Sequence, residues 1–169
     1  MGKKKKNKQE ASKEGASKNS VKIILKNRKA RFNYEILEDY EAGLELVGTE
    51  VKSIRQGKVS IDEAFARFFK DELYIIGMHV KPYEFGNQFN HDPLRKRKLL
   101  LQKRELNKIA IKVQEKGLTI VPLSLYIKNG WVKIQIGIGK GKKLYDKRET
   151  KKKKEMEMEL KRTVKDFNQ

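Results

Sequence analysis

The chain has 169 residues and no cysteine, and its 41 lysines and arginines outnumber 22 aspartates and glutamates to give a net charge of +19. This length suggests one domain with added segments, and the lack of cysteine excludes disulfide bridges and cysteine-based zinc sites. The charge lies at the ends, with +10 in residues 1–31 and +6 in residues 140–169, against +3 between them. Such ends favour a polyanion, RNA or DNA, over an anionic membrane, although lysines can also serve solubility alone.

The first 26 residues are predicted to form a basic N-terminal extension that is disordered when free. Residues 1–20 are rich in lysine, serine and glutamate and contain no aromatic side chain, a composition that cannot bury a core. The segment has no apolar stretch of the kind found in secretory signals, and no long apolar segment elsewhere suggests a membrane anchor. Together with the absence of cysteine, this indicates a cytoplasmic protein.

The first part of the middle segment, residues 27–139, predicts short strands and turns. Residues 32–38 alternate between apolar and polar, and indicate a strand; a turn over 39–43 and a second strand over 44–47 follow. A short helix capped by Thr49 and stopped by Gly57 comes next. The sequence SIDEAF, residues 60–65, has capping-box spacing and predicts a further helical turn.

The later part predicts two strands, a loop, a helix and a hairpin. Residues 65–83 form two strands joined at Lys70-Asp71-Glu72, residues 84–94 form a loop without periodicity, and residues 99–101 form a short apolar strand. A helix ending near Gly117 follows, because its apolar residues recur at helical spacing: Leu106, Ile109, Ala110 and Val113.

Asn129-Gly130, a dipeptide typical of type I′ turns, stands between two alternating segments and predicts a hairpin. Ile134, Ile136 and Ile138 share one face of its second strand. In total the chain predicts six or seven short strands, two or three short helices and no βαβ alternation. This indicates a mainly β fold, a small antiparallel OB-like barrel over residues 27–139 with a basic C-terminal tail over residues 140–169.

The sequence offers no set of residues for catalysis. His79 and His91 lack the spacing of a metal site, and GIGKGKK lacks the spacing and context of a phosphate-binding loop. The carboxylates Glu41, Glu45 and Glu50 have no histidine partner, so surface charge is the better interpretation. We therefore expect a binding protein, with no catalytic residue, metal or cofactor.

Basic residues supply the features expected for nucleic-acid binding. RKRK, Arg95 to Lys98, precedes an apolar strand, Lys128 and Lys133 face outward from the hairpin, and GKGKK leaves it. On one surface of a barrel these side chains would suit a phosphate backbone. Four aromatic residues could stack on bases, although core packing explains each of them more simply: Phe32, Tyr34, Phe68 and Trp131.

Several long motifs resemble the SsrA-binding protein family of bacterial trans-translation, also called small protein B. They include GTEVKSIRQGK, DPLRKRKLLLQKREL, EKGLTIVPLSLYIKNGWVKIQIGIGKGKK and YDKRE, and they span about residues 27–149 in the family's order. The resemblance implies an OB-like barrel that binds the tRNA-like domain of transfer-messenger (SsrA) RNA. It further implies delivery of that RNA to the A site of a stalled 70S-type ribosome for rescue and peptide tagging, by a protein that performs no bond chemistry.

The resemblance also assigns site residues. The family's RNA-contacting positions fall on Glu41, Leu100 and Lys133, and the barrel exit adds Gly141, Lys142 and Lys143. With the basic cluster and its neighbour, the expected RNA-binding set also includes Arg95, Lys98 and Gln102. The motif that family members use on the ribosome matches Tyr145, Asp146, Lys147 and Arg148. Tyr145 stands where some members have histidine, so it keeps an aromatic ring for stacking but cannot carry a positive charge. Gln102 stands where some members have asparagine or histidine, so its contact differs from theirs.

The tail after this motif is predicted to become helical on the ribosome. Asp146 and Glu149 have capping-box spacing, and a thin apolar stripe consists of Met156, Leu160, Val164 and Phe167. Alone such a helix is marginal, but its lysines would gain phosphate partners in an RNA-walled channel. We expect a monomer. The rival interpretations are a generic OB-like RNA-binding or ribosomal protein and, more distantly, an enzyme acting on RNA.

Overall fold

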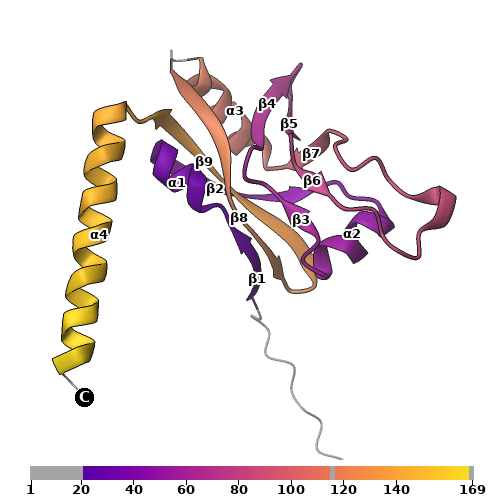
Figure 1. Ribbon diagram of the computed structural model, residues 1–169. Helices are drawn as coiled ribbons and strands as arrows, with labels where there is room; N and C mark the ends of the chain where they lie inside the picture. The colour runs from indigo at the N-terminus through magenta and orange to yellow at the C-terminus, as the bar shows by residue number, and fades with distance from the viewer. Residues whose placement is uncertain (1–20, 115–116, 168–169) are drawn as a thin grey trace, which may run out of the picture.

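The computed structural model describes residues 21–114 and 117–167, which form a β-barrel with four α-helices (Figure 1). Among these residues no helix is both long and apolar enough to cross a membrane. The elements are, in chain order, β1 Val21–Lys26, α1 Arg28–Asn33, β2 Tyr34–Leu44, α2 Gly48–Arg55, β3 Val59–Ser60, β4 Phe65–Phe69, β5 Glu72–Ile76, β6 His79–Val80, the 3-10 helix η1 Asn87–Phe89, β7 Arg97–Leu100, α3 Lys103–Val113, β8 Leu118–Lys128, β9 Trp131–Gly141 and α4 Leu144–Phe167.

The barrel is a closed ring of antiparallel strands, as the sequence predicted. The order β8-β4-β5-β7-β2-β9 returns to its start because β9 also pairs with β8, and β1 adds to another part of β8. The inward residues of these strands form the core, including Leu73, Leu125, Ile134, Ile136 and Ile138. Each such side chain stabilises the fold by about 1.5–3 kcal/mol through its burial.

The β8–β9 hairpin and the helix α3 confirm the strongest sequence signals. Asn129 and Gly130 both have positive φ, 52° and 81°, as a type I′ turn requires. Ile109 of α3 is fully buried, and the Glu105 carboxylate accepts a hydrogen bond of 3.0 Å from the backbone N–H of Gln102 at the start of the helix. Both elements form where they were predicted because local pattern and long-range packing agree, although α3 ends at Val113 and not near Gly117.

The N-terminal part differs from the prediction in three places. Residues 21–26, assigned above to the disordered extension, form β1 against β8, whereas residues 1–20 lie outside the described residues. The segment before β2 forms the short helix α1, whose first turn is capped by Asn27 Oδ1 accepting from Ala30 N–H at 2.8 Å. The predicted turn over 39–43 is the interior of β2, because β9 and β7 pair with it on both sides.

Two predicted helix signals also act differently. The α2 helix forms, but Glu50 caps it by accepting from Val47 N–H at 2.9 Å, while the Thr49 hydroxyl bonds His91 Nδ1. The SIDEAF segment is a turn, closed by Ala64 N–H donating to Ile61 O at 3.2 Å, rather than a helical turn. The Thr49 hydroxyl bonds a residue distant in the sequence, and the SIDEAF segment folds as a turn. Local residue spacing alone does not predict either outcome.

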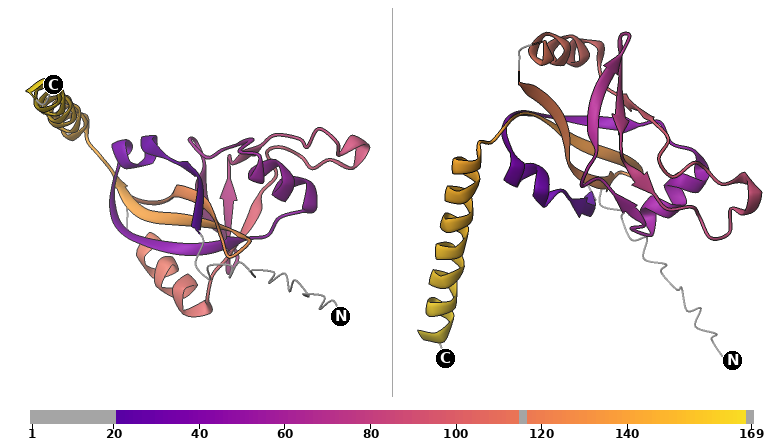
Figure 2. Two further views of the ribbon diagram at one scale, coloured as in Figure 1. Left: turned by 90° about the horizontal axis from the view of Figure 1, so that it is seen from below. Right: turned by 45° about the horizontal axis from the view of Figure 1, so that its top comes forward.

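The C-terminal helix α4 projects from the barrel on the side opposite the loop between β6 and β7 (Figures 1 and 2). It begins at Leu144, earlier than predicted, and Asp146 Oδ2 accepts from Lys143 N–H at 3.1 Å. The exit before it is held in place, since Gly141 belongs to β9 and Lys142 N–H donates to Asn33 O at 2.8 Å. The expected stripe residue Phe167 lies where no side chain is described.

β9 packs so closely on β2 at Gly139 that a side chain at this position should destabilise the fold. A Cβ at Gly139 would lie 2.8 Å from the backbone oxygen of Glu35, whereas a Cβ at Gly141 would meet nothing within 4 Å. We expect Gly139→Ala to lower the free energy of unfolding by about 1–3 kcal/mol through overpacking. Gly141→Ala is the matched control, and urea unfolding of both variants measures the difference. Equal stability of the two would show that β2 moves away from β9 without cost.

Candidate RNA-binding surface

A row of residues crosses four neighbouring strands on the outer face of the barrel. Gly43 of β2 lies opposite Leu100 of β7 on one side and Lys133 of β9 on the other, and Lys133 lies opposite Tyr126 of β8. Residues directly opposite one another project from the same face of a sheet. Their chain neighbours Ala42, Leu99, Ile134 and Leu125 are buried in the core, so this row faces outward. Leu100 is 50% exposed.

Glu41 occupies the adjacent row, opposite Gln135 of β9. Its carboxylate accepts hydrogen bonds from the Tyr126 hydroxyl at 2.6 Å and from Lys128 Nζ at 2.9 Å. These donors hold the pKa of Glu41 below its ordinary value, the Tyr126 hydrogen bond having the largest effect. The carboxylate is thereby both ionised and oriented, while it stays exposed at the surface.

The structure thus brings together Glu41, Leu100 and Lys133, which the family resemblance selected from distant parts of the sequence. Trp131, 75% exposed, extends the same face at the tip of the hairpin, directly opposite Lys128. It is therefore available for stacking. By contrast, Phe68 packs against the core and Tyr34 against a smaller apolar cluster, which confirms core packing for these two. Phe32 is 40% exposed on α1.

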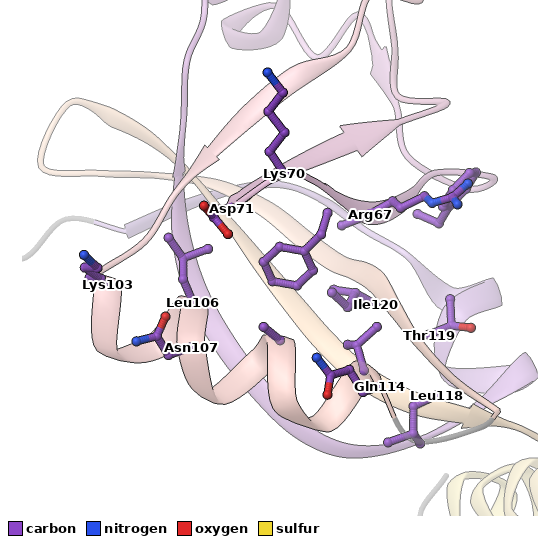
Figure 3. A pocket seen from close by; sticks show the side chains of 15 residues that line it. Arg67, Lys70, Asp71, Lys103, Leu106, Asn107, Gln114, Leu118, Thr119 and Ile120 are labelled. Atoms are coloured by element: carbon purple, nitrogen blue, oxygen red, sulfur yellow. The ribbon is translucent and has the colours of Figure 1, made fainter.

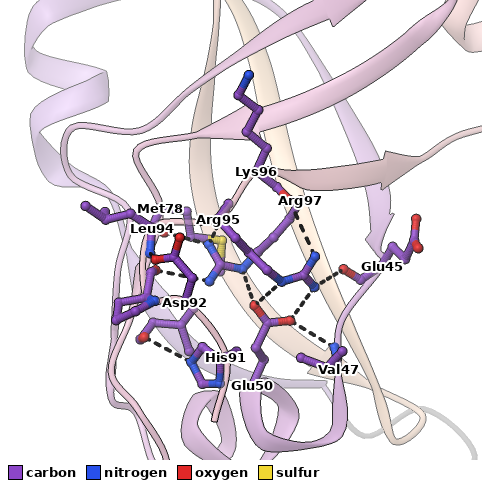
Figure 4. A network of polar contacts seen from close by, with 12 residues as sticks. Glu45, Val47, Glu50, Met78, His91, Asp92, Leu94, Arg95, Lys96 and Arg97 are labelled. Atoms are coloured by element: carbon purple, nitrogen blue, oxygen red, sulfur yellow. Dashed lines mark hydrogen bonds and ion pairs between the residues drawn. The ribbon is translucent and has the colours of Figure 1, made fainter. Parts of the chain in front are cut away.

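The RKRK cluster does not form one basic surface, because Arg97 is fully buried (Figure 4). Its guanidinium donates to Glu50 Oε1 at 2.8 Å and to the carbonyl oxygens of Met78, Arg95 and Pro93. Glu50, expected above to be a surface charge, is also fully buried. The expected surface role of both side chains is therefore wrong, since each neutralises the other inside the protein.

Arg95 shares this network at its edge. Its guanidinium donates to both carboxylate oxygens of Glu50, at 2.8 and 2.6 Å, and to Glu45 O at 3.1 Å. Burial alone would raise the pKa of Glu50, but hydrogen bonds from Arg95 and Val47 N–H and the charge of Arg97 lower it overall. Arg95 therefore has a structural role, and its contact with RNA stays a prediction.

Of the remaining predicted contacts, Lys98 lies two residues before Leu100 on β7, and the others lie outside the central row. Lys98 pairs with Glu72, and Gln102 is exposed at the start of α3. At the barrel exit, Lys142 Nζ reaches Arg31 O at 3.4 Å, and Tyr145 is 69% exposed at the start of α4. Asp146, Lys147 and Arg148 follow in the first turns of the same helix.

Two further features, a cleft and a buried histidine, lie outside the central row. A cleft of about 740 Å³ lies between the β4–β5 hairpin and α3, with Phe68, Leu106 and Ile120 among its lining residues (Figure 3). None of the predicted RNA-contacting residues lines it. His91 is buried between Thr49 Oγ1 and Val80 O, which is a structural role. Within residues 21–114 and 117–167 no group of acidic and histidine side chains is arranged to hold a metal ion.

A hollow that was not predicted from the sequence lies beside the central row. About 550 Å³ in volume, it lies where β1 and α1 meet β8, and its lining includes Tyr126, Gln135, Lys26, Arg28 and Arg31. Alternation along β8 and β9 places Tyr126 and Gln135 on the face of Lys133. The basic residues could not be found in this way, because β1 and α1 were not predicted.

Comparison with known proteins identifies the family. The family model described as SmpB protein matches residues 24–166. A relative named SsrA-binding protein from Thermosynechococcus vestitus is 53% identical over 147 residues, covering 86% of this chain and 97% of the relative. Another of that name from Latilactobacillus sakei is 54% identical over 143 residues, covering 85% and 92%.

A solved structure reported under the words "tmRNA-SmpB: a journey to the center of the bacterial ribosome" is similar in both sequence and fold. One of its chains is 54% identical, the match covers 71% of this chain and 85% of that chain, and the TM-score is 0.60. The OB-like barrel, the outer-face row and these matches lead to one assignment: the chain belongs to the SmpB protein family, whose relatives are named SsrA-binding proteins.

Proposed function

We propose that this protein binds SsrA RNA, also called transfer-messenger RNA, and accompanies it to stalled ribosomes in trans-translation. The names of its relatives and the tmRNA–ribosome context of the similar structure support this function. The observation that carries it is the meeting of Glu41, Leu100 and Lys133 on one outer face, although they come from β2, β7 and β9. The tRNA-like domain of the RNA is the ligand that we assign to this face.

Each residue of this face has a distinct chemical role in the proposed complex. The Lys133 ammonium meets a phosphate and releases a counterion. The ionised Glu41 carboxylate accepts hydrogen bonds from base amino or imino groups, and its donors Tyr126 and Lys128 fix its direction. Leu100, half exposed, offers an apolar surface to a base or ribose. Phosphate contacts hold the RNA, whereas the carboxylate distinguishes one base edge from another.

The tail is assigned to the ribosome. The α4 helix has 24 residues and therefore spans about 36 Å, long enough to enter a channel and report whether it is occupied. Residues 141–143, where the chain leaves the barrel, would contact the RNA. Residues 145–148 would contact the ribosome. On this proposal the protein is a binding protein rather than an enzyme, and it works where ribosomes work, in the cytoplasm.

Replacement of Lys133 by alanine tests the RNA face. We expect several-fold weaker binding of SsrA RNA, and a slope of log affinity against log salt that is smaller by about one, because one phosphate contact is lost. Lys108→Ala removes the same charge from an exposed position on α3 that is not among the expected RNA-binding residues, and it is the matched control. Titrations of SsrA RNA and of ordinary tRNA at several salt concentrations provide the measurement.

Two outcomes would count against the proposal. Equal affinity of the unmodified protein for SsrA RNA and ordinary tRNA would favour a generic RNA-binding protein. An unchanged salt slope for Lys133→Ala would show that Lys133 is a solvated strand residue without a phosphate partner.

A further inference from the structure

Two phenylalanine rings are displayed to solvent on the loop between β6 and β7. Phe85 is 76% exposed and Phe89 is 81% exposed, more than any other phenylalanine described as exposed. The Phe85 ring packs in an edge-to-face arrangement with the Tyr83 ring, with centroids 5.6 Å apart. Neither ring belongs to the core. Two large apolar side chains exposed on one short loop indicate a surface that binds a partner.

The loop that carries these rings is ordered by its own hydrogen bonds. The Asn90 side chain accepts from Tyr83 N–H at 2.9 Å and donates to Tyr83 O at 2.7 Å, which closes the neck of the loop. Inside it, Gly86 N–H donates to Tyr83 O and Phe89 N–H donates to Gly86 O. A Cβ at Gly86 would lie 2.6 Å from the Asn90 amide. The backbone that carries the rings is therefore ordered before a ligand binds, which reduces the entropy lost on binding.

The base of the loop is fixed to the body by buried groups. Arg97 donates to Pro93 O, His91 bonds Val80 O, and the Ser53 hydroxyl of α2 donates to Lys81 O. Figure 4 shows the Arg97–Glu50 pair beside His91, Asp92 and Leu94. This anchoring explains why a segment with no sequence periodicity keeps a defined shape.

A lysine without a described ion-pair partner lies beside the loop. Lys52 of α2 places its ammonium 5.1 Å from the centre of the Tyr83 ring, and it forms no ion pair with any described acidic residue. Phe89 borders a hollow of about 510 Å³ that Lys52 and Arg95 also line. The loop's carboxylate Glu84 is paired with Lys58. Exposed aromatic rings beside a free ammonium group suit unpaired nucleotides, whose bases stack while a phosphate meets the ammonium.

We propose that residues 83–90, together with Lys52, form a second RNA-contacting surface that stacks unpaired bases on Phe85 and Phe89. This inference rests on the proposed function only in taking RNA as the partner. The loop projects from the end of the molecule opposite α4 in all three views (Figures 1 and 2). The bases belong either to SsrA RNA itself or to ribosomal RNA, because stacking chemistry is common to both.

Full-length protein carrying Phe85→Leu and Phe89→Leu tests the stacking. Leucine keeps an exposed apolar side chain but removes the aromatic face, so we expect about tenfold weaker binding of a short single-stranded oligoadenylate per ring lost. The pair Phe85→Tyr and Phe89→Tyr retains the rings and should bind like the unmodified protein. Leu94→Ala, which trims an exposed aliphatic side chain nearby, is a further control. Fluorescence anisotropy of labelled oligoadenylate measures each affinity.

Two further titrations identify the source of the bases. Weaker binding of free SsrA RNA by the leucine variant assigns them to that RNA, whereas a defect seen only when the preformed complex binds ribosomes assigns them to ribosomal RNA. Unchanged oligoadenylate binding by the leucine variant overturns the proposal. If that variant nevertheless binds ribosomes more weakly, the loop contacts a protein instead of RNA. Lys133→Ala, measured in parallel on SsrA RNA, reports on the outer face alone. Failure of the loop proposal is thereby distinguished from failure of the proposed function.

Discussion

Replacement of Glu50 by alanine is expected to lower the free energy of unfolding by about 3–5 kcal/mol, because it leaves the Arg97 guanidinium buried without its counter-charge. Both side chains have 0% exposure, and the Arg97–Glu50 contact of 2.8 Å is joined by two hydrogen bonds from Arg95. The carboxylate also caps α2 through Val47 N–H. One substitution therefore removes an ion pair, a helix cap and the anchor of β7, and urea unfolding measures the total.

Control variants separate the buried pair from ordinary surface charge. Glu38→Ala breaks the exposed pair with Lys112 and should change stability far less. If Glu50→Ala does not fold, Glu50→Gln keeps the test open, because its amide oxygen can still accept the hydrogen bond from Val47 N–H while Arg97 loses its counter-charge. Unchanged stability of Glu50→Ala or of Glu50→Gln would contradict the importance of the buried charge pair.

The same carboxylate predicts how stability depends on pH. The pKa of Glu50 is lower in the folded protein than its ordinary value, since the donors and cations around it outweigh the effect of burial. Its contribution is therefore present above the ordinary carboxyl range and disappears as the pH falls through the folded-state pKa. The stability difference between the unmodified protein and Glu50→Ala should accordingly shrink in acid.

The parts of the fold that the sequence predicted are those in which local and tertiary preferences agree. The Asn129-Gly130 turn and the alternating isoleucines of β9 specify a hairpin by themselves. The turn predicted over 39–43 failed because Gly43 serves a different purpose. A Cβ there would lie 3.2 Å from Leu100 Cβ, so glycine allows β7 to approach β2 within a continuous strand. Only the pairing of distant strands reveals this.

The site was predictable in part, and mostly through family resemblance. No periodicity links Glu41, Leu100 and Lys133, whose proximity depends on the register of three strands. Glu50 and Arg97 were misassigned because charged residues are rarely buried and local sequence gives no sign of the partner. The sequence predicted the Phe85–Phe89 segment only as a loop without periodicity. Its structure is stabilised by the Asn90 side chain and not by a regular helix or strand, so no periodic pattern marks it.

Replacement of Asp146, Lys147 and Arg148 by alanine is expected to separate RNA binding from peptide tagging. The three residues lie in the first turns of α4, outside the barrel, and Asp146 caps the helix by accepting from Lys143 N–H. The outer face with Glu41, Leu100 and Lys133 is untouched. We therefore expect SsrA RNA binding to stay within a few-fold of the unmodified protein and ribosome binding to persist, while tagging of stalled peptides falls close to background.

A matched variant distinguishes a specific motif from general electrostatics. Lys151→Ala, Lys152→Ala and Glu155→Ala together remove two cations and one carboxylate from the same helix, including the Lys151–Glu155 pair. The change in net charge equals that of the first variant, so attraction to a polyanion falls equally in both. A reconstituted tagging assay at saturating SsrA RNA, run beside the binding titration, compares them. Equal tagging by the two variants would show that residues 146–148 contribute only their charge and that α4 is an electrostatic arm. Loss of tagging by the 146–148 variant alone would show that the motif itself acts on the ribosome.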